Sequence, residues 1–505
     1  MKGGTHVPLF LNRDDMMKYD IAIIGSGLGG LECGCLLAKR GFSVCILEKN
    51  GVPGGSLQSF GRGGMRFDTG FHCVGGLDEG QSLRPLFETL GLMDLPWRRM
   101  DDDGFAEVVL GDRSFFFASG HERFAERLAA DFPRRRENLK RFAAVLRETG
   151  EGLRRMLDAG VSATGSYGNE AFGVRAFDFL RRTADDPLLF NVLSGASLTM
   201  ELNAATLPLY VFAQINNSFV QSAWRLDGDG SAIVDRLAEN VRRNGGAVLT
   251  GAKATRLIET DGRISAVEFN GGERVEARCV ISDAHPAATL ELIPESRRIR
   301  RVYRERLSSL ENTFGFFTVH LHLRKNTVRY FNRNIFVYDS EDVWGEHRRS
   351  PAGATLVSCR VPCDGGEFTD NIDILTPMHW EEVERWADTT VGRRGDEYRE
   401  FKRRRAERCV AAAERRIPGL AKCVERMHTS SPLTWRDYTG TRRGSAYGIR
   451  KDCDNLLYTM IAPQTPIANL LLTGQNLNLH GILGVSMTSL FTCEKALDAL
   501  GASKR

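Results

Sequence analysis

Three glycines and one acid near the start of the chain have the spacing of a nucleotide-binding turn. Gly25, Gly27 and Gly30 form a G-x-G-x-x-G sequence between a short apolar run and a helical stretch, and Glu48 ends the next apolar run. Glycine lets the backbone approach a pyrophosphate, whose charge is stabilised by the unpaired N–H groups and positive dipole at the start of a helix. An acid at the position of Glu48 accepts ribose hydroxyls. The segment is therefore predicted to bind an adenine dinucleotide.

The sequence after Glu48 favours FAD over NAD as that dinucleotide. Gly54 and Gly55 follow within a few residues, and the chain remains rich in glycine as far as Gly70. The second strand of a nicotinamide-binding unit usually leads into another helix, whereas glycine-rich backbone can pack against a large planar cofactor. Apolar residues between these glycines argue against a mobile surface loop.

A second glycine-rich region, near the C-terminus, predicts the other half of the same site. A buried strand is expected at 470–472, followed by a turn at 473–476, the segment 480–484 and a helix at 485–497 that carries few charges. The start of such a helix offers bare N–H donors and a positive dipole end. Those groups would stabilise the negative charge that gathers on a reduced flavin, in the way an oxyanion hole works.

Three side chains near these segments could supply a proton. His480 lies at the mouth of the expected C-terminal helix, His72 follows the first glycine-rich region, and Tyr447 lies in a loop bounded by glycines. Histidine exchanges protons near neutral pH and is the commonest general acid or base. His480 is the leading candidate, and its alternative role is a helix N-terminal residue bonded to the backbone.

No metal centre is predicted. His320 and His322 point two imidazoles to one face of an expected strand, but no carboxylate or cysteine of suitable spacing accompanies them. The eleven cysteines are scattered and form neither a C-x-x-C redox pair nor a zinc-binding spacing. This cysteine usage is typical of a reduced cytoplasm, with the thiols serving as small core residues.

Composition limits the partners and the location. A net charge of +4 over 505 residues gives no case for nucleic acid, and the short basic clusters are expected to be solvated helix faces. The first eighteen residues lack a signal-peptide pattern, and no run of eighteen apolar residues could span a bilayer. We therefore expect a cytoplasmic protein, with peripheral contact to an anionic membrane surface as the alternative.

The alternation of apolar, glycine-rich stretches with charged, helical stretches along the chain predicts an α/β fold. Its Rossmann-type FAD-binding domain, similar to that of glutathione reductase, is expected to be built from three separated segments. A parallel sheet with helices is expected from these segments, and the two stretches between them form an inserted α+β substrate-binding lobe. In chain order, the FAD-binding segments are 19–82, 224–285 and 426–505, and the lobe comprises 83–223, mostly helical, and 286–425.

Several segments resemble the phytoene desaturase, carotenoid isomerase and retinol saturase superfamily of FAD proteins, in the order found there. They cover roughly a third of the chain and lie at 19–55, 67–76, 245–286, 430–434, 444–448 and 463–493. The sequence YTGTRRGSAYGIRKD, followed by APQTPIANLLLTGQN, is most similar to the retinol saturase (retinol 13,14-reductase) branch. Many relatives carry Asp in place of Asn476, an amide whose carbonyl can accept the same ribityl hydrogen bond.

The resemblance implies FAD as the cofactor. The residues expected to contact it are Gly25, Gly27, Leu28, Gly29, Gly30, Glu48, Lys49, Gly54, Gly55, Ser56, Gly70, Ala254, Gly474, Gln475, Asn476, Gly481, Ile482, Gly484 and Val485. The first glycines and Glu48 would bind the adenine and pyrophosphate side, and 481–485 would approach the isoalloxazine ring.

The resemblance also implies an FAD-dependent oxidoreductase acting on a carbon–carbon double bond of a hydrophobic polyene or isoprenoid-like lipid. The expected direction is reduction, by hydride transfer from flavin N5. The alternatives are a redox-neutral flavin isomerase, a phytoene-type desaturase, an amine oxidase-like flavoenzyme and a non-enzymatic prenyl-lipid carrier of the GDP-dissociation-inhibitor type. No second G-x-G-x-x-G unit and no redox disulfide are present, so NAD(P)H or another electron partner would have to bind elsewhere.

Overall fold

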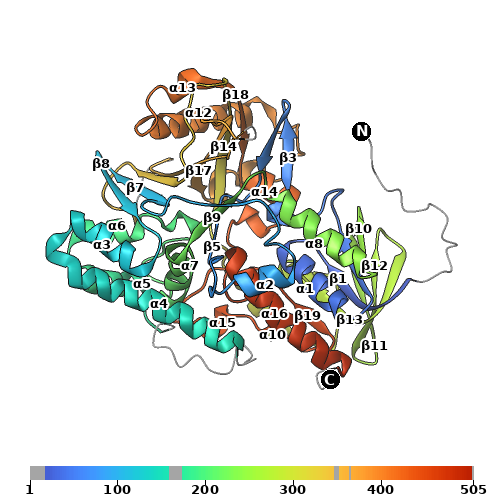
Figure 1. Ribbon diagram of the computed structural model, residues 1–505. Coiled ribbons are helices and arrows are strands. Elements are labelled where there is room, and N and C mark those ends of the chain that lie inside the picture. Colours follow the sequence, from blue (N-terminus) through green and yellow to red (C-terminus); the bar gives the residue numbers. More distant parts are fainter. Residues whose placement is uncertain (1–16, 159–172, 346–351, 363–364, 503–505) are drawn as a thin grey trace.

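The computed structural model, described for residues 17–158, 173–345, 352–362 and 365–502, is organised around two seven-stranded sheets (Figure 1). The first sheet has the order β10-β2-β1-β13-β12-β11, with β19 also paired to β13. Its strands are β1 (Met17–Ile24), β2 (Val44–Glu48), β10 (Ala247–Thr250), β11 (Ala254–Thr260), β12 (Arg263–Phe269), β13 (Glu273–Ser282) and β19 (Leu470–Leu472). The expected Rossmann-type α/β fold is confirmed.

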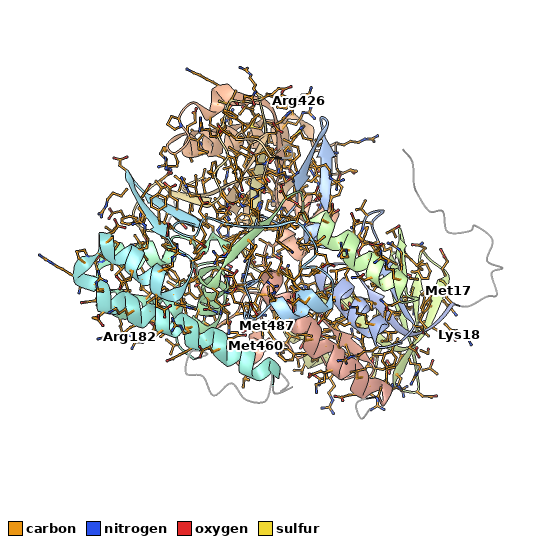
Figure 2. The ribbon with its side chains drawn as sticks, in the orientation of Figure 1. Met17, Lys18, Arg182, Arg426, Met460 and Met487 are labelled. Atoms are coloured by element: carbon orange, nitrogen blue, oxygen red, sulfur yellow. The ribbon has the colours of Figure 1, made fainter. Side chains whose placement is uncertain are left out.

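The parallel part of this sheet is the element that positions the nucleotide-binding turn. Strands β10, β2, β1, β13 and β19 run parallel, whereas β12 and β11 add an antiparallel edge. Every residue of β2 is buried, as expected for a parallel strand covered on both faces. Beside it, helix α1 (Leu28–Lys39) contacts both α8 (Ser231–Arg243) and α16 (Gly481–Leu500). The buried Met487 of α16, labelled in Figure 2, belongs to the core they share.

The second sheet has the order β18-β14-β17-β16-β15-β7-β8. Its strands are β7 (Ala106–Leu110), β8 (Arg113–Phe117), β14 (Gly315–Leu323), β15 (Asn334–Tyr338), β16 (Ala354–Cys359), β17 (Asn371–Met378) and β18 (Val424–Ser430). Helix α12 (Gly395–Glu414) contacts β14, β16 and β17. In Figure 1 this sheet and α12 lie above the first sheet, and a helical layer lies to the left.

Smaller elements connect these parts. The helical layer comprises α3 (His121–Asp131), α4 (Arg136–Asp158), α5 (Ala176–Ala184), α6 (Pro187–Ser194) and α7 (Leu209–Gln221). Short sheets are formed by β3 (Ser59–Arg62) with β4 (Met65–Asp68), and by β5 (Val74–Gly75), β9 (Ala223–Leu226) and β6 (Trp97–Arg99). The remaining α-helices are α2 (Arg84–Thr89), α9 (Pro286–Glu291), α10 (Arg301–Ser309), α13 (Leu420–Cys423), α14 (Pro432–Thr439) and α15 (Leu456–Thr459). Among the described residues, no helix is both long and apolar enough to cross a membrane.

Several elements differ from their expected form. The stretch 247–258, whose apolar residues are typical of one strand, is divided into β10 and β11 at Gly251, whose φ of +69° turns the backbone out of the extended conformation. The C-terminal helix begins at Gly481 rather than at 485. The segment 83–223 contributes β7 and β8 to the second sheet in addition to its helices, because β7 pairs in parallel with the distant β15.

The predicted limits between the FAD-binding segments and the inserted lobe also differ from the packing at two places. Strand β18 continues the second sheet to Ser430, beyond the expected limit at 425. Leu290 of α9 and Leu307 of α10 pack into the core that lies against the first sheet, although the sequence places that stretch in the inserted lobe. Both differences arise from tertiary packing, which the local sequence pattern does not reveal.

Candidate functional site

A cavity of about 420 Å³ lies at the carboxyl ends of β1, β2 and β13. In open parallel sheets this edge is where ligands bind. Of the residues predicted to contact FAD, the cavity is lined by Gly25, Gly27, Leu28, Gly29, Glu48, Lys49, Gly54, Gly55, Ser56, Ala254, Gly474, Gln475, Asn476 and Val485. The two glycine-rich regions, more than 400 residues apart in sequence, therefore meet at one site.

A second cavity, the inner chamber, adjoins the first and has a volume of about 210 Å³. Gly70, Gly481 and Ile482 line it, and it shares Leu28, Ser56, Leu57, Gln475 and Val485 with the nucleotide cavity. All three candidate proton donors, His72, Tyr447 and His480, also line the chamber. The two cavities are therefore adjacent, and together they are called the groove here; Glu48 lines the first cavity and the three candidate proton donors line the second.

Of the predicted contacts, Gly30 and Gly484 line neither cavity. A Cβ on Gly30 would lie 2.1 Å from the carbonyl oxygen of Gly25, and one on Gly484 would lie 2.3 Å from that of Leu479. Both distances are far below van der Waals contact, so these two glycines are required for packing of the turns that form the groove.

The backbone of the glycine turns fits an anionic, elongated ligand. A Cβ on Gly29 would lie 3.1 Å from the Cα of Gly474, and one on Gly55 would lie 3.2 Å from the Cα of Gly27. The turns thus touch each other through backbone alone. Helix α1 has no side-chain cap from Gly27 and no acid in its first turn, so its dipole and the N–H groups that Asp283 does not bind are available to a phosphate.

Glu48 is held in a fixed orientation at the end of β2. Its side chain is 5% exposed, and Oε2 accepts hydrogen bonds from the backbone N–H of Ser26 at 3.1 Å and from the Ser26 hydroxyl at 2.6 Å. Oε1 accepts from the backbone N–H of Asn50 at 2.8 Å. A carboxylate has about four acceptor positions, and three are used here, so Glu48 retains capacity to accept about one further hydrogen bond, from a ribose hydroxyl.

Asp283 lies at the end of β13 in the nucleotide cavity and was not among the predicted residues. Burial, together with the charge of Glu48, raises the pKa of Asp283 to about 7, against the opposing effect of hydrogen bonds from the backbone N–H groups of Gly30 and Gly27. This carboxyl group therefore occupies part of the anion-binding turn. An acid at the carboxyl end of a central parallel strand was the sequence signal that could have identified it.

Two of the three candidate proton donors already donate their protons in hydrogen bonds to backbone carbonyl oxygens. The hydroxyl of Tyr447 donates to the carbonyl oxygen of Leu198 at 2.6 Å, and Nε2 of His480 donates to that of Thr199 at 3.0 Å. Their rings pack with centroids 4.5 Å apart. Burial raises the pKa of Tyr447 and lowers the pKa of His480 to about 4, so both are neutral near pH 7.

His72 differs from these two residues. Its Nε2 is buried, and no hydrogen-bond partner for it is present among the described residues. Burial lowers the pKa of His72 to about 4. Of the three candidates, His72 is thus the one whose ring is not committed to a backbone carbonyl. His72 therefore replaces His480 as our leading candidate, and a catalytic role for either residue stays a prediction.

His320 and His322 do not form a shared site. Nδ1 of His320 donates to Asp373 at 2.6 Å, whereas Nε2 of His322 lies 3.9 Å from Glu425. The two side chains therefore have different partners, although they lie on the same face of β14.

Comparisons with known proteins agree with this geometry. A family model described as NAD(P)-binding Rossmann-like domain matches residues 23–90. The chain is 27% identical to all-trans-retinol 13,14-reductase of Rattus norvegicus, covering 95% of this chain and 86% of that protein. It is 24% identical to chloroplastic prolycopene isomerase 2 of an Oncidium hybrid cultivar, covering 97% and 86%.

Solved structures share the fold. Putrescine oxidase bound to putrescine superposes with a TM-score of 0.64 at 16% identity, over 96% of this chain and 100% of that chain. An oxidoreductase from Methanosarcina mazei gives a TM-score of 0.62, also at 16% identity, over 95% and 100%. These two structures therefore share the Rossmann-type fold of this chain.

The homologues of this chain include all-trans-retinol 13,14-reductases and prolycopene isomerases. The resemblance to the superfamily that contains both is confirmed.

Proposed function

We propose that the protein is an FAD-dependent oxidoreductase that reduces a carbon–carbon double bond of a hydrophobic polyene or isoprenoid-like lipid. The observation that carries this proposal is that the nucleotide cavity, which Glu48 lines, adjoins the inner chamber, which His72 lines. The match to retinol 13,14-reductases over nearly the whole chain supports the substrate class. When bound, FAD would supply the hydride for such a reduction.

Each chain segment that lines the groove has a proposed role in binding FAD. Glu48 would accept a ribose hydroxyl, and the N–H groups at the start of α1 would bind the pyrophosphate. Gln475 and Asn476 would contact the ribityl chain, although Oδ1 of Asn476 also accepts from the backbone N–H of Ile449 at 3.2 Å. Gly481 and Ile482, at the start of α16, would stabilise negative charge on the flavin ring.

The lining of the inner chamber favours a polyene over an amine. Phe219, Phe316, Leu356 and Leu375 line it, and none of its described lining residues is a carboxylate that could pair with an ammonium group. An apolar wall excludes water from the double bond and orients a flat chain by contact alone. The uncapped glycine turns argue against a lipid carrier, which has no need to bind a dinucleotide.

The experiment that tests this function is anaerobic reduction of the flavin followed by reoxidation. NADH and NADPH are the first donors to try, and NAD(P)H is our proposal for the electron partner. Conjugated polyene alcohols should reoxidise the reduced flavin and lose their absorbance, whereas putrescine should fail to reduce oxidised flavin. Reduction of the flavin by amines, with no response to polyenes, would assign the chain to the amine oxidase alternative.

Glu48→Ala should weaken FAD binding without unfolding the protein. Each charge-assisted hydrogen bond lost is worth roughly 1.5–3 kcal/mol, so the Kd should rise by about 10- to 100-fold. Quenching of FAD fluorescence measures the Kd, and thermal denaturation checks the fold. Glu276→Ala removes an acid from the same sheet that pairs with Lys18 at 3.2 Å outside the groove, and it should leave the Kd unchanged. An unchanged Kd in the Glu48 variant would make Glu48 a purely structural acid.

FAD binding should weaken as the pH rises through the pKa of Asp283, which is about 7. The deprotonated carboxylate, next to Glu48 and the first glycine turn, repels the pyrophosphate, whereas the protonated carboxyl does not. Asp283→Asn should therefore bind FAD about tenfold more tightly than wild type at about pH 8, an effect equal to one pKa unit of coupling. The measurement is the Kd of both proteins between about pH 6 and pH 8. A wild-type Kd that does not vary with pH would contradict this prediction.

We also propose peripheral contact with an anionic membrane, because a polyene substrate resides in lipid. Two exposed apolar side chains, Val302 of α10 at 76% and Leu457 of α15 at 92%, flank Arg306, which donates to the carbonyl oxygen of Leu457 at 3.0 Å. Leu457→Asp should reduce sedimentation with vesicles that contain phosphatidylserine, and high salt should release the wild-type protein. Binding that resists both high salt and an alkaline wash would contradict a peripheral mode.

A further inference from the structure

A third cavity, here called the outer cavity, has a volume of about 380 Å³ and lies beside the inner chamber. Its walls come from β3, β14, β18, α12 and α14. The outer cavity reaches the surface, because its lining residues Met427 and Tyr438 are 38% and 45% exposed. None of the residues predicted to contact FAD or to donate a proton lines it, so its role is open.

The outer cavity and the inner chamber share one wall. Trp435 of α14 lines both cavities and is 5% exposed. Thr69 lines the outer cavity, and the next residue, Gly70, lines the chamber. A Cβ on Gly70 would lie 3.0 Å from Cη2 of Trp435, so the edge of the indole packs directly against this backbone. A ligand in the outer cavity would therefore lie next to the chamber.

Three basic side chains line the outer cavity without an ion-pair partner among the described residues, namely Arg62 of β3, Lys402 of α12 and His428 of β18. Nζ of Lys402 donates to the carbonyl oxygen of Thr429 at 3.4 Å and lies 5.1 Å from the ring centroid of Tyr398. Both contacts leave its charge without a counterion.

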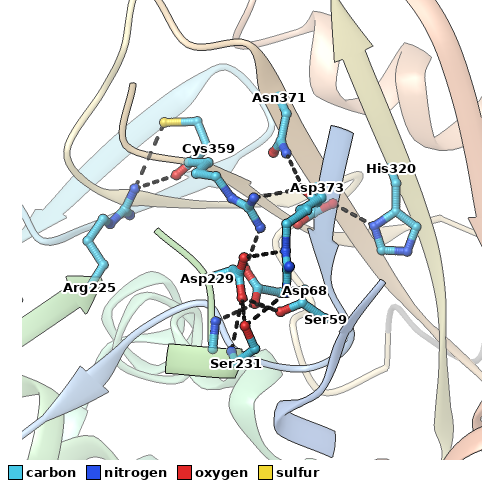
Figure 3. Close-up of polar contacts among 12 residues, drawn as sticks. Ser59, Asp68, Arg225, Asp229, Ser231, His320, Cys359, Asn371 and Asp373 are labelled. Atoms are coloured by element: carbon cyan, nitrogen blue, oxygen red, sulfur yellow. Dashed lines mark hydrogen bonds and ion pairs between the residues drawn. The ribbon is translucent and has the colours of Figure 1, made fainter. Parts of the chain in front are cut away.

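The acids near the outer cavity are engaged by other cations. Nδ1 of His320 donates to Oδ1 of Asp373 at 2.6 Å (Figure 3), and Asp373 is 8% exposed and does not line the cavity. Asp437 of α14 pairs with Arg394. None of the described residues that line the cavity is a carboxylate, so its positive charge is not compensated from within.

Lys402 differs in this respect from its neighbours on α12. Arg403 and Arg404 both pair with Glu400, at 2.7 and 2.6 Å. Burial and a neighbouring arginine lower the pKa of Lys402, and burial and neighbouring cations lower the pKa of His428. A bound anion would relieve the repulsion among these groups.

The rest of the lining fits a nucleotide better than a lipid chain. Phe60, Trp435 and Tyr438 supply aromatic rings, on which a planar base or a nicotinamide can stack. Side-chain hydroxyls, which can bind sugar and phosphate oxygens, come from Thr69, Thr429, Ser430, Thr434 and Thr439. Lysine and arginine are the usual cations that bind phosphate. A lipid chain would instead need a mostly apolar wall.

We propose that the outer cavity binds a reduced nicotinamide dinucleotide, with its phosphates at Arg62, Lys402 and His428 and its nicotinamide at the wall that Trp435 forms. This inference rests on the proposed function, which requires an electron donor for FAD. The chain has no second G-x-G-x-x-G unit, so a donor must bind at a site built in a different way. A carboxylate-free cavity with three uncompensated basic side chains meets that requirement.

The electrons and atoms of the donor step balance. One hydride, with its electron pair, leaves C4 of the nicotinamide and goes to oxidised FAD, and the nicotinamide becomes the oxidised pyridinium. The same two electrons leave the flavin with the hydride that adds to one alkene carbon, and a proton from solvent adds to the adjacent carbon. Each turnover therefore oxidises one dinucleotide and takes up one proton.

Binding can be measured on oxidised, FAD-loaded protein, in which the nucleotide cavity is filled and no turnover occurs. Isothermal titration calorimetry should detect binding of NAD⁺ or NADP⁺, and inorganic pyrophosphate should compete with it. Lys402→Met and Arg62→Gln each remove one charge-assisted contact, so each should raise the Kd for the dinucleotide and for pyrophosphate about tenfold. Arg426→Gln is the matched control, because Arg426 (Figure 2) is an exposed cation of β18 that does not line the cavity. It should leave both Kd values unchanged.

Two results of this titration would overturn the proposal. One is failure of both dinucleotides to bind, and the other is the same Kd in wild type, Lys402→Met and Arg62→Gln. Geranylgeranyl diphosphate is the rival probe. If it displaces pyrophosphate and the dinucleotides do not, the cavity binds a phosphorylated lipid and the proposal is wrong.

Measurement of the two half-reactions separates this proposal from the proposed function. Anaerobic stopped-flow reduction of the flavin by NADH or NADPH, without polyene, should require about tenfold more donor in Lys402→Met than in wild type, with the same limiting rate. Enzyme reduced with dithionite and mixed with polyene tests the proposed function alone. Flavin reduction by the dinucleotide without any polyene reduction would refute the proposed function and support the donor site. Polyene reduction by dithionite-reduced enzyme that neither NADH nor NADPH can reduce would overturn the donor site.

Discussion

His72→Phe is expected to slow reduction of the polyene by roughly 10²–10⁴-fold, the usual contribution of a general acid. The variant keeps the ring volume in the chamber but removes the one candidate imidazole that is not bonded to a backbone carbonyl. FAD binding should survive, since His72 lines the chamber and not the nucleotide cavity. Single-turnover reoxidation of pre-reduced enzyme measures the rate of this step directly.

A comparison with His480→Phe and the pH dependence of the rate would test the same role of His72. His480→Phe should have a smaller effect on the rate than His72→Phe, because the Nε2 proton of His480 is already donated to Thr199. With a pKa of about 4, His72 is neutral throughout the neutral range, so the wild-type rate should not fall with the ionisation of a free histidine near pH 6.5. Equal rates for wild type and His72→Phe would remove His72 from the chemistry.

The second large effect is expected from Gly30→Ala, which should weaken FAD binding by about 10²-fold. The new Cβ would lie 2.1 Å from the carbonyl oxygen of Gly25, and relief of such an overlap requires the turn to open, at a cost of about 3 kcal/mol. The measurement is the Kd for FAD together with the melting temperature of the apoprotein.

Gly51→Ala is the matched control for that variant. Gly51 follows Glu48 closely in the sequence, yet a Cβ there would meet no atom within 4 Å. It should therefore bind FAD as wild type does. Retention of wild-type affinity by Gly30→Ala would show that the turn does not need its observed shape to bind the cofactor.

The nucleotide-binding half of the fold could be predicted because its signals are local. The strand, glycine turn, helix and acid that end at Glu48 lie within a few dozen residues, and each is required by backbone geometry. The start of α16 is similar, since its glycines and polar turn directly precede it. The FAD contacts that these local patterns predict all line the groove, apart from Gly30 and Gly484.

The rest of the site depends on pairing between distant strands. Asp373 meets His320 only because β14 and β17 are in register across 53 residues of sequence, and no local pattern specifies that register. Asp283 reaches the glycine turn because β13 lies next to β1. His480 had seemed the best proton donor because of its position at a helix start, and only the contact with Thr199 shows that its proton is committed.

The most direct test of the central claim, that this chain saturates a double bond, is the mass of the product formed in one turnover. Enzyme carrying fully reduced FAD would be mixed anaerobically with a conjugated polyene alcohol, and the extracted product would be analysed by mass spectrometry. The account predicts a gain of two hydrogens together with reoxidation of the flavin. A loss of two hydrogens, or an unchanged mass with altered double-bond geometry, would contradict it and assign the chain to a desaturase or an isomerase.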